Sequence, residues 1–285
     1  AQVVAGRDLQ VSAASAVNRA SGTLAAADTL DLRVAGLLDN AGRLRGQTSL
    51  LLQAGSFQHS GELYAGQALA LHSAGALDNR GTLIAGGDLR IEAGRLSNSG
   101  QLGSETGQVT LSSQGDMQLG GSVIAAQALS ASALGDLQVE GALKAQSATL
   151  AAGRDLSVAG GAQTAAALEL QAKRALRVDG QALAGGDLRL SGASIATGTA
   201  AVLQGAAAVT LQGGAIDSRG TLAAGTDLTL RSDGALAVAG VAQAKRDIAL
   251  DAGAALSNAG QVVAGRDLSV AAHSIDNAAS GTLAA

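Results

Sequence analysis

The sequence predicts an all-β protein, a right-handed parallel β-helix (solenoid) of about 14 coils with 19–21 residues each. Glycines recur about every 20 residues along the whole chain, and apolar and polar residues alternate in short runs between them. The apolar residues are mainly Ala, Leu and Val, whereas Phe57 and Tyr64 are the only aromatic residues and Pro is absent. Small aliphatic side chains suit a narrow interior that repeats from layer to layer.

Internal repetition is the strongest signal in the sequence. The tripeptide Gly-Thr-Leu begins at residues 22, 81, 220 and 281, and residues 2–26 are identical to residues 261–285 at 19 of 25 positions. We place the equivalent residues of successive coils at Gly22, Gly42, Gly61, Gly81, Gly100, Gly121, Gly141, Gly161, Gly180, Thr199, Gly220, Gly240, Gly260 and Gly281. A fixed period over the whole length predicts one stacked array.

A single unit, residues 81–99, predicts three short strands separated by turns. Three strands in about 20 residues leave no room for a helix, so consecutive coils must stack in parallel, and such crossovers are right-handed. Alternation places Leu89 and Ile91 inside and Arg90 and Glu92 outside. Phe57 replaces a leucine of the third strand and is assigned to the core.

An aspartate follows the first turn of many coils. At Asp88 we expect the carboxylate to accept backbone N–H bonds and close its own turn. The pattern Asp-Leu-x-(Leu/Val/Ile) begins at Asp8, Asp88, Asp136, Asp155, Asp187, Asp227 and Asp267. We predict a structural role for these residues.

A second pattern, Leu or Ile followed two residues later by Asn, marks another corner. It gives a predicted structural ladder of Asn40, Asn79, Asn98, Asn258 and Asn277, with His59 in the same position of its coil. Such asparagines either bond along the axis or supply left-handed backbone angles. We divide the single domain, residues 1–285, into Asn-corner coils (1–100 and 206–285) and Ala/Gln/Ser-rich coils (101–205).

Several functional classes are not supported by the composition. The net charge is −4 without a basic stripe, which argues against nucleic acid. Cysteine is absent, the three histidines lack a second ligand at metal-like spacing, and no apolar run is long enough to insert into a membrane. We therefore expect no catalytic residues, no metal site and no cofactor.

Three outward residues remain candidate surface contacts. Tyr64 occupies a variable outward position, and Arg154 and Arg174 lie 20 residues apart, so they should stack on neighbouring coils. A basic stripe for sulfated glycans is one interpretation of these arginines. Nearby acids, including Asp155, favour a solvated face of mixed charge.

The unit Gly-Thr-Leu-x-Ala-Gly-x-Asp-Leu-x-Leu-x-Ala-Gly-x-Leu-x-Asn resembles the filamentous haemagglutinin-type repeats of two-partner-secreted bacterial exoproteins. That group includes filamentous haemagglutinin adhesins and contact-dependent growth inhibition toxins. The resemblance covers essentially the whole chain and is weaker in the Asn-free middle. It implies secretion to the bacterial cell surface by an outer-membrane two-partner transporter, which acts on a region outside this segment.

The resulting functional hypothesis is a structural shaft that projects a distal receptor-binding or toxic region. We expect the segment to be a fragment of a longer chain. One alternative is a module that binds a host or target-cell receptor or glycan directly. A second alternative is a β-helical polysaccharide lyase or hydrolase, although such enzymes carry long loops over a groove of carboxylates, and no coil here has an insertion beyond about two residues.

Overall fold

The structure, a computed structural model, describes residues 1–285 and consists of β-strands and turns without any helix. A membrane-spanning helix is accordingly not found. Tertiary contacts divide the chain into unit 1 (Ala1–Asp136 and Glu140–Gln146) and unit 2 (Leu137–Val139 and Ser147–Ala285). Both units are built from coils with three walls, and the chain forms a β-solenoid of about 14 turns. The predicted all-β solenoid is confirmed.

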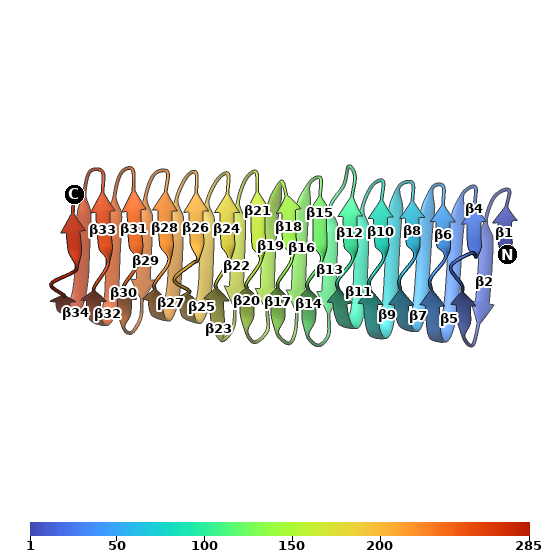
Figure 1. Ribbon diagram of the computed structural model, residues 1–285, viewed down its shortest axis with the longest axis horizontal. Coiled ribbons are helices and arrows are strands. Elements are labelled where there is room, and N and C mark those ends of the chain that lie inside the picture. The colour runs from blue at the N-terminus through green and yellow to red at the C-terminus, as the bar shows by residue number, and fades with distance from the viewer. The chain divides into compact units, whose positions relative to one another are not determined.

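The first wall of each unit is a sheet of short parallel strands. Neighbouring first-wall strands, such as β8 and β10, pair in parallel one coil apart and lie side by side in Figure 1. In unit 1 they are β1 (Gln2–Ala5), β4 (Thr23–Ala26), β6 (Arg43–Gly46), β8 (Glu62–Ala65), β10 (Thr82–Ala85), β12 (Gln101–Ser104), β15 (Ser122–Ala125) and β18 (Ala142–Ala145). In unit 2 they are β21 (Gly161–Thr164), β24 (Gln181–Ala184), β26 (Val202–Gly205), β28 (Thr221–Ala224), β31 (Val241–Ala244), β33 (Gln261–Ala264) and β35 (Thr282–Ala284).

The second and third walls are joined in many coils by one long strand that bends at the corner between them. In unit 1 these walls comprise β2 (Leu9–Ala13), β3 (Ala16–Asn18), β5 (Thr29–Asn40), β7 (Ser49–His59), β9 (Ala68–Asn79), β11 (Leu89–Asn98), β13 (Val109–Ser113), β14 (Met117–Leu119) and β16 (Ala128–Ala133). In unit 2 they comprise β17 (Leu137–Val139), β19 (Ser147–Ala152), β20 (Leu156–Val158), β22 (Leu168–Ala172), β23 (Ala175–Val178), β25 (Leu188–Thr197), β27 (Val209–Ser218), β29 (Leu228–Ser232), β30 (Leu236–Val238), β32 (Ile248–Asn258) and β34 (Leu268–Asn277).

The core of each unit is a set of apolar columns, because residues of one position pair in register from coil to coil. On the second wall Leu50, Leu69 and Leu89 are paired in this way, and each is fully buried. Burying one such leucine contributes about 1.5–3 kcal/mol. Phe57 lies between Leu38 and Leu77 in the third-wall column and is fully buried, as predicted.

Strand alternation follows the prediction on β11. Leu89 and Ile91 are buried, whereas Arg90 is exposed and Glu92 is half-buried on the outer face. The same alternation on β8 buries Leu63 and directs Tyr64 outward. In most coils, each wall therefore has about two side chains that point outward. These outward side chains form the surface available for contacts with other molecules.

The third corner, where one coil passes to the next, depends on glycine because of close approach between coils. A Cβ added to Gly81 would lie 2.2 Å from the carbonyl oxygen of Gly61, and one added to Gly100 would lie 2.1 Å from that of Gly81. No residue of the chain has a positive φ, so these glycines are not required for left-handed backbone. Stacked backbones leave no space for a side chain at this position.

Two residues of the predicted series are placed wrongly by sequence spacing. Gly161 pairs with Gln181, so Gly160 lies opposite Gly180 and occupies the corner position. In the later coil, Val202 pairs with Thr221, so Ala201 rather than Thr199 lies opposite Gly220. The corner before Ala201 is longer by two residues than its neighbours and contains a tight turn, which shifts the equivalent position.

Candidate functional site

The predicted Asn ladder lies at the end of the third wall, where Asn40, Asn79, Asn98 and Asn258 are buried between coils and Asn277, in the last coil, is exposed. Asn79 Nδ2 donates to Asn98 Oδ1 at 2.7 Å, and Asn258 Nδ2 donates to Asn277 Oδ1 at 2.8 Å. Asn40 Nδ2 contacts His59 Nδ1 at 2.9 Å. These amides bond along the stack, and because no φ is positive, the alternative role in left-handed backbone is wrong.

The Asn column changes character in the middle of the sequence. In unit 1, Leu119 pairs with Asn98 and takes the next position of the column. In unit 2, Val158 and Val178 occupy the same column before Thr197 restores a polar side chain. A buried amide without a neighbouring amide loses a hydrogen bond, and replacement by Leu or Val avoids that cost.

The first corner of each coil joins the first wall to the second. Its aspartates form hydrogen bonds to the next coil, whereas the sequence predicts that each closes its own turn. Asp8 Oδ1 accepts from Thr29 N at 3.1 Å, and Asp88 Oδ1 accepts from Gln108 N at 3.0 Å. Each acceptor therefore lies about one coil before its donor. The carboxylate fixes the spacing of neighbouring turns instead of shaping a single one.

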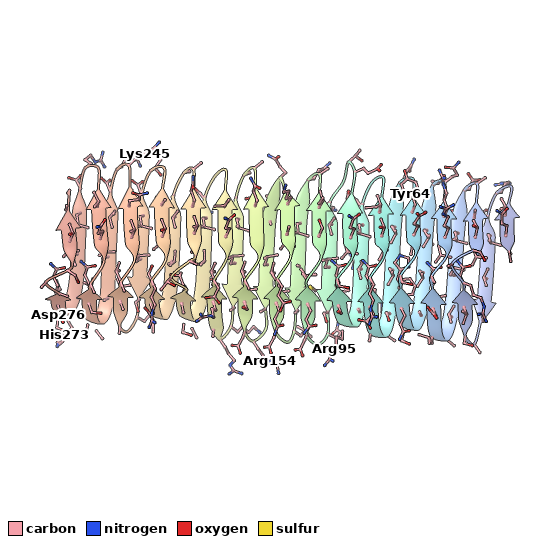
Figure 2. All side chains as sticks on the ribbon, in the orientation of Figure 1. Tyr64, Arg95, Arg154, Lys245, His273 and Asp276 are labelled. Atoms are coloured by element: carbon pink, nitrogen blue, oxygen red, sulfur yellow. The ribbon has the colours of Figure 1, made fainter.

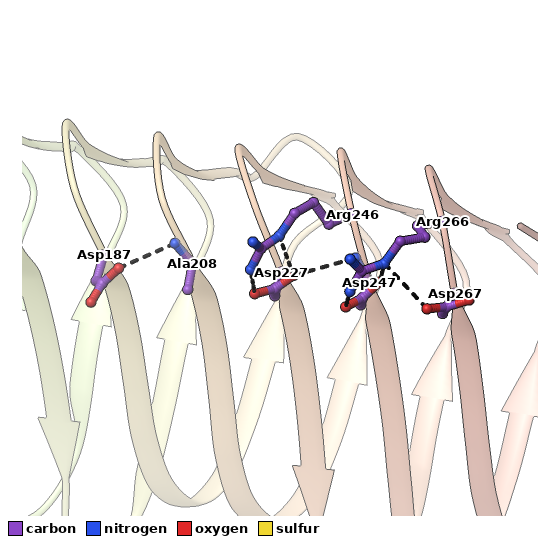
Figure 3. A network of polar contacts seen from close by, with 7 residues as sticks. All are labelled: Asp187, Ala208, Asp227, Arg246, Asp247, Arg266 and Asp267. Atoms are coloured by element: carbon purple, nitrogen blue, oxygen red, sulfur yellow. Dashed lines mark hydrogen bonds and ion pairs between the residues drawn. The ribbon is translucent and has the colours of Figure 1, made fainter.

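In unit 2 the first corner carries a linked group of acids and bases from Asp227 to Asp267, and a separate bond between Asp187 and Ala208 precedes it (Figure 3). Asp187 Oδ1 accepts from Ala208 N at 3.2 Å. Arg246 Nε donates to Asp227 at 3.1 Å, and Arg266 donates to Asp247 and contacts Asp267. The Arg246 side chain, by hydrogen bonding, lowers the pKa of Asp227. All these groups are paired and solvated.

Asp136 and Asp155 lie at a different corner from the other predicted turn aspartates. Both precede third-wall strands, β17 and β20, whereas Asp88 precedes a second-wall strand. Asp155 Oδ1 accepts from Ala175 N at 3.0 Å. The local sequence Asp-Leu-x-Val is therefore shared by two corners, and spacing within one coil does not separate them.

The candidate surface contacts are partnered. Arg174 N donates to Arg154 O at 3.0 Å, so the two arginines lie on neighbouring coils, and Arg174 Nε lies 3.7 Å from Asp155 Oδ1. Arg154 projects away from the ribbon (Figure 2). Tyr64 points outward but is half-buried, with the Arg45 guanidinium 5.4 Å from its ring centroid. A face of mixed charge fits this arrangement better than a basic stripe.

A cluster that the sequence patterns did not indicate lies on the outer face of the second wall in unit 1. Four consecutive coils contribute one pair of outward residues each, which we call the second-wall cluster: Asp31 and Arg33, Leu51 and Gln53, Ala70 and His72, Arg90 and Glu92. They line a hollow of about 140 Å³.

Charges within the second-wall cluster are paired along each strand. Arg33 donates to Asp31 at 3.0 Å, and Arg90 Nε donates to Glu92 Oε1 at 3.0 Å. His72 Nδ1 lies 3.5 Å from Glu92 Oε2. The hydrogen bond from Arg90 lowers the pKa of Glu92, so this carboxylate stays ionised. The Asp31 side chain is recessed, while both guanidiniums remain largely exposed.

This geometry contains no group of three or more His, Asp or Glu side chains that could hold a metal ion. A family model described as haemagglutinin repeat matches residues 4–81, 49–121, 118–161, 146–220, 192–240, 202–260 and 253–285. The chain belongs to the haemagglutinin repeat family. No curated protein and no solved structure matches it.

Membership of the haemagglutinin repeat family confirms the resemblance inferred from the sequence. Proteins with such repeats are adhesin-type proteins, typically secreted and surface-exposed, in the general context of two-partner secretion. The second-wall cluster of this haemagglutinin repeat chain was missed because its members are about 20 residues apart. Only the pairing register brings them together, and the single local signal is an apolar residue, Leu51, at an outward position.

Proposed function

We propose that this segment is the structural shaft of a secreted bacterial surface adhesin or contact-dependent inhibition toxin, which carries a distal receptor-binding or toxic region. The observation that supports it most directly is the uniformity of the coils. First-wall strands keep the same register, and equivalent corners differ by three residues at most. Interactions spread evenly over nearest neighbours suit a mechanical role.

In this proposal the outer-membrane transporter of the two-partner route acts on a region outside these residues. The chain has no cysteine, so it forms no disulfide that would obstruct passage through an oxidising periplasm. The division into Asn-corner coils and coils with Leu or Val in that column is a variation within one shaft. It alters the bonding inside the third corner and leaves the coil period unchanged.

A competition assay tests the shaft against direct receptor or glycan binding. Bacteria that display the parent protein are allowed to adhere to target cells in the presence of excess purified 285-residue chain. A shaft has no receptor of its own, so adhesion should remain unchanged. Saturable inhibition by the purified chain, together with its saturable binding to target cells in the absence of bacteria, would show that this segment itself binds the cell, and the shaft proposal would then be wrong.

A further inference from the structure

The order of residues along the second-wall cluster is complementary to its own reverse. The hydrogen bonds and ion pairs within the cluster do not depend on this complementarity. Along one outward column the order is Asp31, Leu51, Ala70, Arg90, and along the other it is Arg33, Gln53, His72, Glu92. Reading either column backwards exchanges acid for base at its ends, and in the first column it also exchanges the large Leu51 for the small Ala70. Coils are spaced about 4.8 Å apart, so the cluster is about 14 Å long.

We propose that this surface binds the same surface of a second copy of the chain, with the two solenoid axes antiparallel. A two-fold axis parallel to the strands keeps each column facing itself and reverses the order of coils. Asp31 then faces Arg90 of the second copy, and Arg33 faces Glu92 of the second copy. At each end of the contact, the acid and base of one chain therefore face the base and acid of the other, so the four charges alternate in sign around a square.

The apolar residues at the centre favour this antiparallel arrangement over a parallel one. Leu51 is 42% exposed, and the small side chain of Ala70 lines the same hollow. In the antiparallel arrangement Leu51 faces Ala70 of the second copy and enters that hollow, and Gln53 faces His72. A parallel arrangement would also oppose acids to bases, but it would place Leu51 against Gln53 and leave the hollow unfilled.

The coils that flank the cluster are compatible with the same contact. The coil before it presents Gln10 and Ser12, and the coil after it presents Thr110 and Ser112. The two-fold axis brings these coils opposite each other, and all four side chains are uncharged. No pair of like charges opposes the approach over six coils.

The contact is small, which sets its expected strength. Six coils of a five-residue wall give a face of about 29 by 16 Å. This is roughly half the area that each partner contributes to a standard protein interface. We therefore expect a dissociation constant of about 10 µM to 1 mM that rises with salt, because exposed charges contribute to it. Repeated contacts along longer chains would strengthen the association.

Sedimentation equilibrium of the 285-residue chain tests the charge pattern. The wild-type chain should form dimers as its concentration rises, and added NaCl should weaken them. The double variant Arg90→Glu with Glu92→Arg keeps a bridge within its strand but opposes like charges across the two-fold axis, so at least a tenfold loss of affinity is expected. Adding Asp31→Arg and Arg33→Asp to the same chain should restore the dimer.

The matched control is the pair of Arg177, on the third-wall strand β23, and Asp179, in the corner that follows it; the two have the same spacing and the same bridge in unit 2. Exchanging these two residues should leave dimerisation unchanged. Circular dichroism must show every variant folded, and the four-residue exchange serves as the internal check. A chain that stays monomeric at about 1 mM, or an Arg90/Glu92 exchange without effect, contradicts the proposal.

Cross-linking tests the direction of the two chains, because the protein has no cysteine. A mixture of Gln10→Cys and Thr110→Cys chains should form the mixed disulfide, since these positions face each other in the antiparallel dimer. Gln10→Cys alone should not cross-link, because its two copies would lie about 24 Å apart. Rapid cross-linking of Gln10→Cys to itself would indicate a parallel pair and overturn the antiparallel arrangement.

Discussion

The buried amides of the third corner form ladders with a fixed direction. Asn18 Nδ2 and Asn79 Nδ2 each donate to the residue one coil later in the sequence. A ladder can begin without loss, because the backbone N–H of Gly81 donates to the free Oδ1 of Asn79. The end of a ladder depends on its surroundings: Asn98 Nδ2 faces Leu119 and has no hydrogen-bond partner, whereas Asn277 Nδ2 donates to the Gly281 carbonyl oxygen at 3.2 Å.

His59 occupies one position of this ladder and must be neutral there. The amide of Asn40 can only donate to Nδ1, and the carbonyl of Thr82 can only accept from Nε2 at 3.1 Å. Protonation would put two donors face to face. Burial lowers the pKa of His59, against the opposing effect of the bonds with Thr82 and Asn40.

The free energy of unfolding should therefore decrease as pH is lowered, and His59 should account for part of this decrease. A histidine whose pKa is lower in the folded than in the unfolded state stabilises fully above about pH 6.5, and this stabilisation is lost as pH falls through the folded pKa. The loss is at most about 1.4 kcal/mol per pH unit for one proton. His59→Asn, which continues the ladder, should reduce the difference in urea midpoint between pH 7.5 and 5.

The matched control for His59 is His273→Asn, which removes an exposed imidazole. This variant should keep the wild-type pH dependence. Equal pH dependence of all three proteins in urea titrations would show that His59 is not the group responsible.

At the level of the structural element, the third corner is a stack of backbones in contact. Its glycines are required because the neighbouring coil leaves no room for a Cβ atom. Gly161, in contrast, begins β21 and has open space around it. The two kinds are indistinguishable in a single sequence. Only the pairing of Gly161 with Gln181 reveals that Gly160 is the corner residue.

Alanine substitutions should separate these two kinds of glycine. Gly81→Ala places a methyl group 2.2 Å from the Gly61 carbonyl oxygen, and forcing the coils apart should cost about 1–3 kcal/mol. Gly161→Ala meets nothing within 4 Å and should be neutral or stabilising by about 0.5 kcal/mol. Denaturant melts of both variants measure the difference, and similar losses would contradict contact between coils as the cause.

The elements differ in how far the sequence could predict them. The inward positions of Leu89 and Ile91 follow from strict alternation, which needs only local sequence. The bond from Gln108 N to Asp88 could not be predicted in the same way, because it joins residues 20 apart whose turns had first to be aligned. The two-residue corner extension before Ala201 likewise moves the register without changing the mean period.

For the whole molecule, period and composition were sufficient to predict a solenoid, because no other fold repeats three short strands every 20 residues. The second-wall cluster was not predictable, since its meaning lies in the order of residues across four coils. Solenoid stability is a sum over nearest neighbours, so a coil is defined by the two interfaces it makes.

Removal of one complete coil should accordingly be tolerated. Deleting residues 221–240 would bring Ser218, whose Oγ lacks a partner, next to Asn258 and would join two coils with continuous second and third walls. Circular dichroism should show a folded chain with a cooperative melt. Deleting residues 226–235, half a coil, should abolish that transition, and tolerance of this shorter deletion would contradict the model of discrete coils.

The repeated glycine corner thus has a consequence for the gene as well as for the protein. Because every coil begins with nearly the same backbone contact, unequal crossing-over between such sites adds or removes about 20 codons and restores an intact joint. Changes of one or two residues are absorbed within a corner, as before Ala201, whereas a change of half a coil would misalign the walls. We therefore expect large changes in the length of this protein to occur in multiples of about 20 residues.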